Sequence, residues 1–232
     1  MVYLKSDLLA KSINDKWDIL NDIEDKKCIS SIDLTALEYL SWDEDDKIRN
    51  RVAEILVGSA SKESEDILVR LLKDKDSLVR ANAADSLCIS TSLEVLDLLK
   101  KRLLKDKSIL VRGYSALSIL DIATNTKQDI NKLSNFFKGV LKKEKRIWVK
   151  LNLYEVLYLC GEEVYLNNLI SELNNRYFTN RVATVASLHN ITSNKNKLII
   201  KTAILERLKI ETVHLVKRKI ENILQQMDIE TN

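Results

Sequence analysis

A basic residue recurs along the chain at nearly regular intervals, and this feature restricts the fold more than any other. The column consists of Arg49, Arg80, Arg112, Lys150 and Lys217, which are separated by 31, 32, 38 and 67 residues. The last spacing is that of two repeats, with a weaker unit around Arg181 whose register is ambiguous. Such a period indicates one supersecondary unit used several times.

Apolar residues stand at fixed offsets from the basic column. An aliphatic residue precedes each member, and residues suited to a core follow three and seven positions later, as in Val79, Ala83 and Leu87 around Arg80. Offsets of −1, +3 and +7 lie on one stripe of an α-helix. Each column residue is therefore predicted to lie on a helix with one buried side.

The remaining segments predict another helix in each unit, in addition to the column helix. Amphipathic stretches occur between the column helices, at about residues 63–73, 93–105, 129–143, 163–175 and 197–209. Proline is absent and only four glycines occur, so the chain lacks the punctuation of strands and hairpins. We expect an all-α fold, a right-handed α-α superhelix of about six helical hairpins.

The domain organisation follows from the extent of the repeats. We expect an N-terminal capping helix over residues 1–28, one repeat array over residues 29–228 as a single domain, and a tail of residues 229–232. Asp45, Asp76 and Ser108 lie four residues before the first three column positions, where an N-cap residue accepts hydrogen bonds from free backbone amides.

The stretch from Asp76 to Leu87 resembles the HEAT repeats of the short bacterial type that is related to phycobilin-lyase subunits. It fits the pattern Asp…Val-Arg…Ala…Leu, which residues 45–56 and 108–119 repeat. The resemblance covers about residues 30–228 and weakens after Lys150, and the proline common in the first helix of HEAT repeats is missing. It implies that the second helices line a concave face. It also implies that Arg49, Arg80 and Arg112 are structural and pair with Asp45 or Asp76 in a polar ladder.

The side of the second helices opposite the core stripe is the predicted binding face. It carries mainly acidic and amide side chains, which suit a protein or peptide better than DNA. The alternative reading is a solvated side selected only for solubility. The candidate residues are Arg51, Glu54, Asn82, Asp85, Tyr114, Asp121, Asn152 and Glu155.

The charge distribution is uneven although the net charge is only +3. Residues 1–60 hold 8 Lys/Arg and 13 Asp/Glu, a net −5, whereas residues 181–232 hold 9 and 5, a net +4. Such polarity steers a charged partner without identifying it. Basic clusters at residues 100–102, 142–146 and 217–219 could contact phosphate, but they also fit a solvated outer face.

Most enzyme classes lack their residues in this sequence. His189 and His214 stand in no metal-binding spacing, and no glycine-rich phosphate loop occurs. The three cysteines, Cys28, Cys88 and Cys160, form no CxxC pair and read as reduced, mostly buried thiols. We expect no cofactor and no metal site.

One enzymatic alternative stays open, because alkylpurine DNA glycosylases use a similar HEAT-like fold. These enzymes need an acidic residue and aromatic side chains in a basic groove. The candidates for these roles are Asp121 near Tyr114, or Glu155 near Trp148 and Tyr154. Trp148 occupies a core position of the repeat, which argues against that role. We therefore expect a non-catalytic, cytoplasmic interaction module, an adaptor, scaffold or inhibitor, that binds another protein. Nucleic acid is the second choice of partner, no membrane is expected, and the oligomeric state is open.

Overall fold

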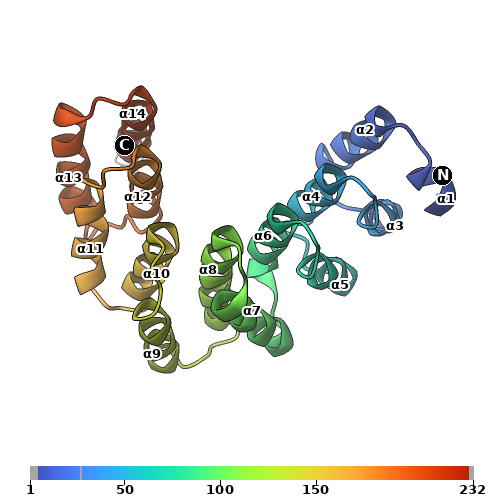
Figure 1. The fold of residues 1–232 in the computed structure, drawn as a ribbon, viewed down its shortest axis with the longest axis horizontal. Helices are drawn as coiled ribbons and strands as arrows, with labels where there is room; N and C mark the ends of the chain where they lie inside the picture. The colour runs from blue at the N-terminus through green and yellow to red at the C-terminus, as the bar shows by residue number, and fades with distance from the viewer. Residues whose placement is uncertain (1–4, 27, 230–232) are drawn as a thin grey trace. The chain divides into compact units, whose positions relative to one another are not determined.

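The fold is a stack of helical pairs (Figure 1). The computed structural model describes residues 5–26 and 28–229, and regular structure in these ranges consists of fourteen α-helices and one short 3-10 helix. No strand occurs among these residues, so the predicted all-α repeat fold is confirmed.

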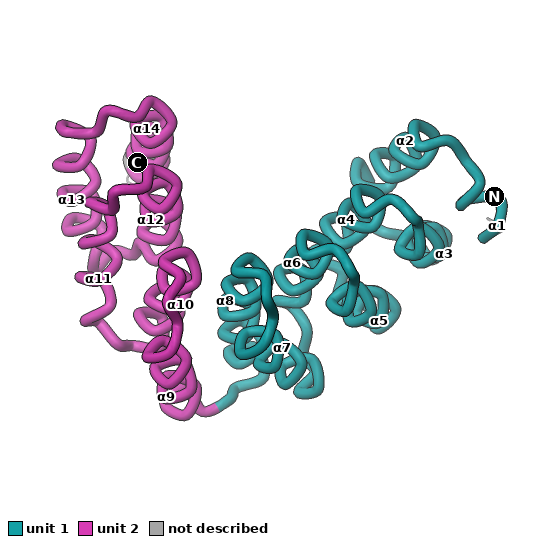
Figure 2. Tube along the Cα trace, in the orientation of Figure 1, with its two compact units in different colours: residues 1–128 teal, residues 129–232 magenta. Residues whose placement is uncertain are grey.

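The chain forms two compact units, residues 1–128 and 129–232 (Figure 2). The helices of unit 1 are α1 (Lys5–Leu9), α2 (Ile13–Glu24), α3 (Ser31–Leu40), α4 (Asp46–Ile55), α5 (Lys62–Leu71), α6 (Ser77–Ser86), η1 (Leu87–Ile89), α7 (Leu93–Lys105) and α8 (Ile109–Asn125). Those of unit 2 are α9 (Ile130–Leu141), α10 (Ile147–Leu159), α11 (Val164–Glu172), α12 (Phe178–Asn190), α13 (Lys197–Ile210) and α14 (His214–Ile229).

Each unit contains a row of second helices, here called B helices. In unit 1 the B helices α2, α4, α6 and α8 each contact the next one, and in unit 2 α10, α12 and α14 do the same. The first helices of the pairs, the odd-numbered A helices, pack against these rows from α3 onwards, whereas α1 packs against α3. The B helices α4, α6, α8, α10 and α14 carry the basic column that the sequence singled out.

The predicted core stripe is buried. Positions −1, +3 and +7 of the column have exposed fractions of 0 or 1% at Val79, Ala83 and Leu87, and the corresponding residues of α4, α8 and α10 are buried as well. Burial of each Val, Leu or Ile in the stripe contributes on the order of 1.5–3 kcal/mol relative to an exposed side chain. The core therefore runs along one side of the B rows.

The helix starts follow the expected caps in part. The carboxylate of Asp45 accepts a hydrogen bond from the Lys47 amide, and Asp76 accepts from two amides at the start of α6. Ser108 occupies the N-cap of α8 but its hydroxyl caps no amide. Asp45 and Asp76 are thus N-caps, as predicted.

The domain boundaries differ from the expected ones. Residues predicted as one capping helix form α1 and α2, and the predicted single array is divided after residue 128. The spacing from Arg112 to Lys150 is 38 instead of 31 or 32, and α8 is 17 residues long. The longer repeat thus coincides with the boundary. The predicted tail, apart from Ile229, lies outside the described residues.

The arginine column forms a ladder between successive units. Arg49 donates two hydrogen bonds to the Asp74 carboxylate, at 2.7 and 2.9 Å, and two more to the carbonyls of Asp43 and Glu44. Arg80 repeats this arrangement with Asp106, at 3.0 and 2.9 Å. Each guanidinium thereby ties its own interhelical turn to the turn of the next pair.

The acidic partners differ from the predicted ones. Arg49 and Arg80 were expected to pair with Asp45 or Asp76, but these two carboxylates are occupied as helix caps. The partners Asp74 and Asp106 instead lie six residues before Arg80 and Arg112, in the turn that precedes each B helix. Arg112 donates to the carbonyls of Asp106 and Lys107 in the same manner as the other two.

The ladder also identifies the repeat whose register was ambiguous. Arg181 donates to both carboxylate oxygens of Glu211 at 2.7 Å and to the carbonyls of Asn175 and Arg176. It therefore belongs to the column and places α12 in register. The preceding residue is Asn180 where other repeats have an aliphatic side chain, which obscured the pattern.

Burial and pairing have opposite effects on these carboxylates. Burial alone would raise the pKa of Asp74, but the hydrogen bonds from Arg49 and from the Asp76 amide outweigh it and lower the pKa. The bonds from Arg181 lower the pKa of Glu211 to about 2. These carboxylates are thus charged at neutral pH, and the ladder consists of ion pairs.

Candidate functional site

The candidate site is the polar row along the B helices of unit 1, opposite the core stripe. Its N-terminal part is internally paired. Arg51 on α4 forms ion pairs with Glu24 on α2 and with Glu54 of its own helix. The amide of Asn82 on α6 donates to Asn50 and Glu54, both at 2.9 Å. These residues join three B helices to one another.

The C-terminal part of the same row is acidic and lacks a cation. Asp85 lies on α6 and Asp121 on α8. Neither side chain forms a hydrogen bond or ion pair with another of the described residues, although the Asp85 carbonyl accepts a bond from the Ser118 hydroxyl. This part of the row differs from the paired part in having two carboxylates without a counter-charge.

The surroundings of these carboxylates disfavour their charged form. Burial, and then the charge of Asp121, raise the pKa of Asp85. Asp121 keeps exposed surface, yet burial of its carboxyl raises its pKa as well. The pKa of Tyr114 is raised by burial and by Asp85, which places this half-buried phenol beside the pair. We call Asp85, Tyr114 and Asp121 the acidic cluster.

The two predicted residues of unit 2 lie in a different setting. Asn152 and Glu155 on α10 are only 7% and 4% exposed. The Asn152 amide donates to the Trp148 carbonyl at 2.7 Å, and Glu155 accepts a bond of 2.9 Å from Asn190 on α12. Glu155 therefore serves to link two B helices. Its candidate role as a catalytic acid beside Trp148 and Tyr154 has no support in this geometry.

Cys28 lies in the connection between α2 and α3, Cys88 in η1 and Cys160 at the C-cap of α10. Cys28 is exposed, which differs from the expectation of mostly buried thiols, and Cys88 and Cys160 are half-buried. Burial raises the pKa of Cys160 to about 11, and burial together with Asp121 and Asp85 raises that of Cys88. Both thiols are therefore protonated and weakly nucleophilic at neutral pH.

An exposed tryptophan escaped the sequence analysis. Trp42, in the turn after α3, is 52% exposed, with the guanidinium of Arg70 at 4.2 Å and the ammonium of Lys5 at 4.9 Å from its ring centroid. Its indole donates to Glu38 at 3.0 Å. Its position in the sequence could have indicated that the side chain is exposed, because Trp42 lies seven residues before Arg49 and outside the core stripe.

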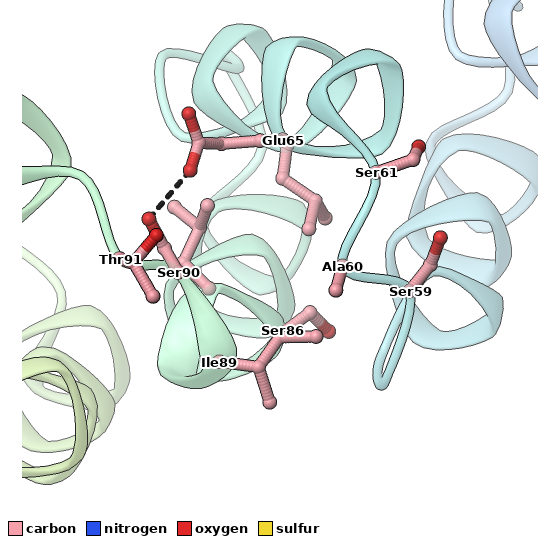
Figure 3. Close-up of a pocket in the computed structure, with 10 residues that line it drawn as sticks. Ser59, Ala60, Ser61, Glu65, Ser86, Ile89, Ser90 and Thr91 are labelled. Carbon is pink, nitrogen blue, oxygen red and sulfur yellow. Dashed lines mark hydrogen bonds between the residues drawn. The ribbon is translucent and has the colours of Figure 1, made fainter. Parts of the chain in front are cut away.

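A small pocket of about 90 Å³ lies among hydroxyl groups of unit 1 (Figure 3). Its lining includes Glu65, Ser86 and Ser90. The Ser90 hydroxyl donates to Glu65, and the Ser86 hydroxyl donates to the Ala53 carbonyl. Because these polar groups already have partners, the pocket indicates no ligand.

Metal binding and membrane insertion each require a recognisable arrangement of residues. Within the described residues no group of three or more His, Cys, Asp or Glu side chains is arranged to hold a metal ion. No helix in that part of the chain combines the length and apolar character needed to cross a membrane.

Two solved structures show a weak similarity to this chain. Human deoxyhypusine hydroxylase in complex with glycerol is 13% identical, with a TM-score of 0.46, and the match covers 97% of this chain and 94% of that one. A designed armadillo repeat protein is 16% identical, with a TM-score of 0.39, and 96% of this chain and 98% of that chain are covered. Scores this low carry no conclusion about activity.

The family comparison concerns the middle of unit 1. No match was found among curated proteins. The family model of HEAT repeats matches residues 34–119, which run from α3 into α8 and include the ladder of Arg49, Arg80 and Arg112. The narrower likeness to phycobilin-lyase subunits stays a prediction. Residues 34–119 are thus similar in sequence to HEAT repeats.

Proposed function

We propose that this chain is a non-catalytic protein-interaction module that binds a partner through the acidic cluster of unit 1. The observation that carries the proposal is the pair Asp85 and Asp121, two carboxylates on adjacent B helices without a cation among the described residues. A Lys or Arg side chain of the partner would supply the missing charge. Charge-assisted hydrogen bonds of this kind are roughly twice as strong as neutral ones.

The remainder of the row supports the same role. Tyr114 offers a half-buried aromatic ring next to the carboxylates, and aromatic side chains are frequent at the energetic centre of interfaces. The paired residues Arg51, Glu54 and Asn82 fix the spacing of the B helices instead of contacting the partner. The binding surface is thus narrower than the row predicted from the sequence.

The acidic cluster disfavours the nucleic-acid alternative for this face. Phosphate groups need a basic lining, whereas Asp85 and Asp121 repel them. The fold is shared by binding proteins and enzymes, so it does not by itself decide between the two.

The test is affinity purification of the tagged protein from its native host, with mass spectrometry of the partners. The variant Asp85→Asn with Asp121→Asn removes both charges but keeps the side-chain volumes. We expect it to lose the partner while its helical signal is unchanged. Tyr114→Ala should weaken the same interaction by about 2 kcal/mol or more if the ring is a hot spot.

A matched control keeps the same change in charge away from the row. Glu63→Gln with Glu94→Gln alters two exposed carboxylates on A helices. This variant should retain the partner. Retention by the Asp85/Asp121 variant, or equal loss in the control, would contradict the proposal. Retention on a heparin column at moderate salt that increases in the Asp85/Asp121 variant would favour a nucleic-acid role.

A further inference from the structure

The pair formed by α13 and α14 exposes several large apolar side chains. On α13, Leu198 is 78% exposed, Ile199 53% and Ile210 64%, and Leu215 in the first turn of α14 is 51% exposed. Leu198 and Leu205 are seven positions apart and hence on one side of α13, while Ile200 and Ile204 are buried on another. Exposed apolar patches of this kind promote association with another surface.

Basic side chains border this apolar surface. Lys195 in the turn before α13, Lys209 near its end and Arg218 on α14 are all exposed. None of the three forms a hydrogen bond or ion pair through its side chain with another described residue. Together with the exposed apolar residues of α13 and α14, these three basic residues define the C-terminal face, which is partly apolar and carries positive charge.

The first B helix presents the opposite charge. Asp15, Asp18, Asp22 and Asp25 follow one another at intervals of three or four residues, which places them on one side of α2 and its C-cap. All four are exposed. Asp18, Asp22 and Asp25 have no cation partner among the described residues. We call this side of α2 the N-terminal face.

We propose that this protein associates with a second copy of itself head to tail, with the N-terminal face of one copy on the C-terminal face of the next. The two faces carry charges of opposite sign, in regions whose net charges are −5 and +4. The N-terminal face belongs to α2, and the C-terminal face belongs to the pair α13 and α14, so docking would pack helix against helix as within each unit. Such a heterologous contact propagates into open chains unless it closes into a ring. The contact is independent of the acidic cluster on α6 and α8.

Sedimentation velocity over a range of protein concentrations tests the contact. The wild type should associate in a concentration-dependent manner. Raising the salt from about 0.1 M to about 1 M shortens the Debye length from about 10 Å to about 3 Å and should weaken the association. Asp18→Lys with Asp22→Lys, and separately Lys209→Glu with Arg218→Glu, should each weaken it at least about tenfold, because like charges then face one another.

Mixing these two variants gives the decisive result. Each variant alone joins two faces of like charge, whereas the mixture offers faces of opposite charge in both pairings, so association should return. Leu198→Ser should weaken association with the melting temperature unchanged, since Leu198 is mostly exposed. Circular dichroism of every variant verifies that the helices are intact.

Control substitutions separate this contact from general charge effects. Glu63→Lys with Glu94→Lys, and Lys101→Glu with Lys142→Glu, make the same charge changes at exposed positions outside both faces. They should leave the association constant within about threefold of the wild type. A wild type that stays monomeric at all concentrations, or a mixture that fails to associate, overturns the proposal.

Discussion

At the residue scale, unit 1 places two carboxylates where their charged form is unfavourable. Burial and mutual repulsion raise the pKa of Asp85, and burial raises that of Asp121. The carboxyl groups of Asp85 and Asp121 therefore stay protonated to a higher pH in the folded state than in the unfolded state. Its stability decreases as pH rises from the ordinary value of 3.8 through the raised pKa values.

The variant Asp85→Asn with Asp121→Asn should therefore be more stable than the wild type at neutral pH. The difference should vanish at about pH 3, where the carboxyls are protonated in both states, and grow as the pH rises. Thermal unfolding followed by circular dichroism at several pH values measures it. A constant difference across the pH range would show that the effect comes from packing instead of charge.

The Arg181–Glu211 pair gives the opposite pH dependence. Both side chains are buried, and hydrogen bonds from Arg181 lower the pKa of Glu211 to about 2 from an ordinary 4.5. The stability from this pair is fully present above pH 4.5 and is lost as the pH falls towards 2.

Removal of Glu211 should leave two mostly buried guanidinium groups without their counter-charge, because Arg181 and Arg207 both pair with this carboxylate. Glu211→Ala should cost roughly 3–5 kcal/mol at neutral pH, measured by urea unfolding. The triple change Arg181→Met, Arg207→Met and Glu211→Met should cost less, because no lone charge stays buried. If the triple variant is the less stable of the two, the ion pairs themselves provide net stabilisation.

At the scale of the element, the B helix is the unit that the sequence predicted best. Its apolar stripe at −1, +3 and +7 coincides with buried positions, and Asp45 and Asp76 cap the helices as expected. These properties depend on residues close in sequence, so periodicity exposes them. The partners of Arg49 and Arg80 lie 25 and 26 residues further on, and the helical period contains no information about such contacts.

A signal for those partners was nevertheless present. An acid or amide stands six residues before each basic column position, at Asp43, Asp74, Asp106, Glu144, Asn175 and Glu211. The sequence-based prediction assigned the pairing acids to the cap position, four residues before the column, and therefore did not include these residues. The acidic cluster could be located as polar positions, but its lack of a counter-charge depends on how α6 and α8 are packed.

The helix α6 gives a test of the element itself. Leu87, at the +7 position, is 1% exposed, and its replacement by Ala should cost about 2–5 kcal/mol through lost burial and a residual cavity. Leu93, which is 54% exposed at the start of α7, is the control. Leu93→Ala should change the free energy of unfolding by less than about 0.5 kcal/mol. Equal losses in urea unfolding would mean that the core stripe is misplaced.

At the scale of the whole molecule, the division into two compact units is the feature that the repeat pattern did not predict. Each repeat has the same local signature, so periodicity alone shows where repeats recur and not where one compact unit ends and the next begins. The boundary after residue 128 follows α8, and the nearby Lys127 adopts a left-handed backbone conformation with φ of 54°. A non-glycine residue in this conformation is uncommon and costs roughly 1–2 kcal/mol.

The turn that contains Lys127 should be the first site of limited trypsin digestion. Cleavage requires several residues on each side of the bond to unfold locally, which is least costly where few contacts are lost. Lys127 is exposed and lies next to the boundary. Lys105 is the last residue of α7 and Lys107 lies in the turn before α8, and these two helices pack against each other. Early digestion should therefore yield fragments 1–127 and 128–232, identified by intact mass. Lys127→Gln should delay both fragments together. A first cut at Lys105 or Lys107 would contradict this prediction. It would show that the turn between α7 and α8, inside unit 1, unfolds locally more easily than the turn at Lys127.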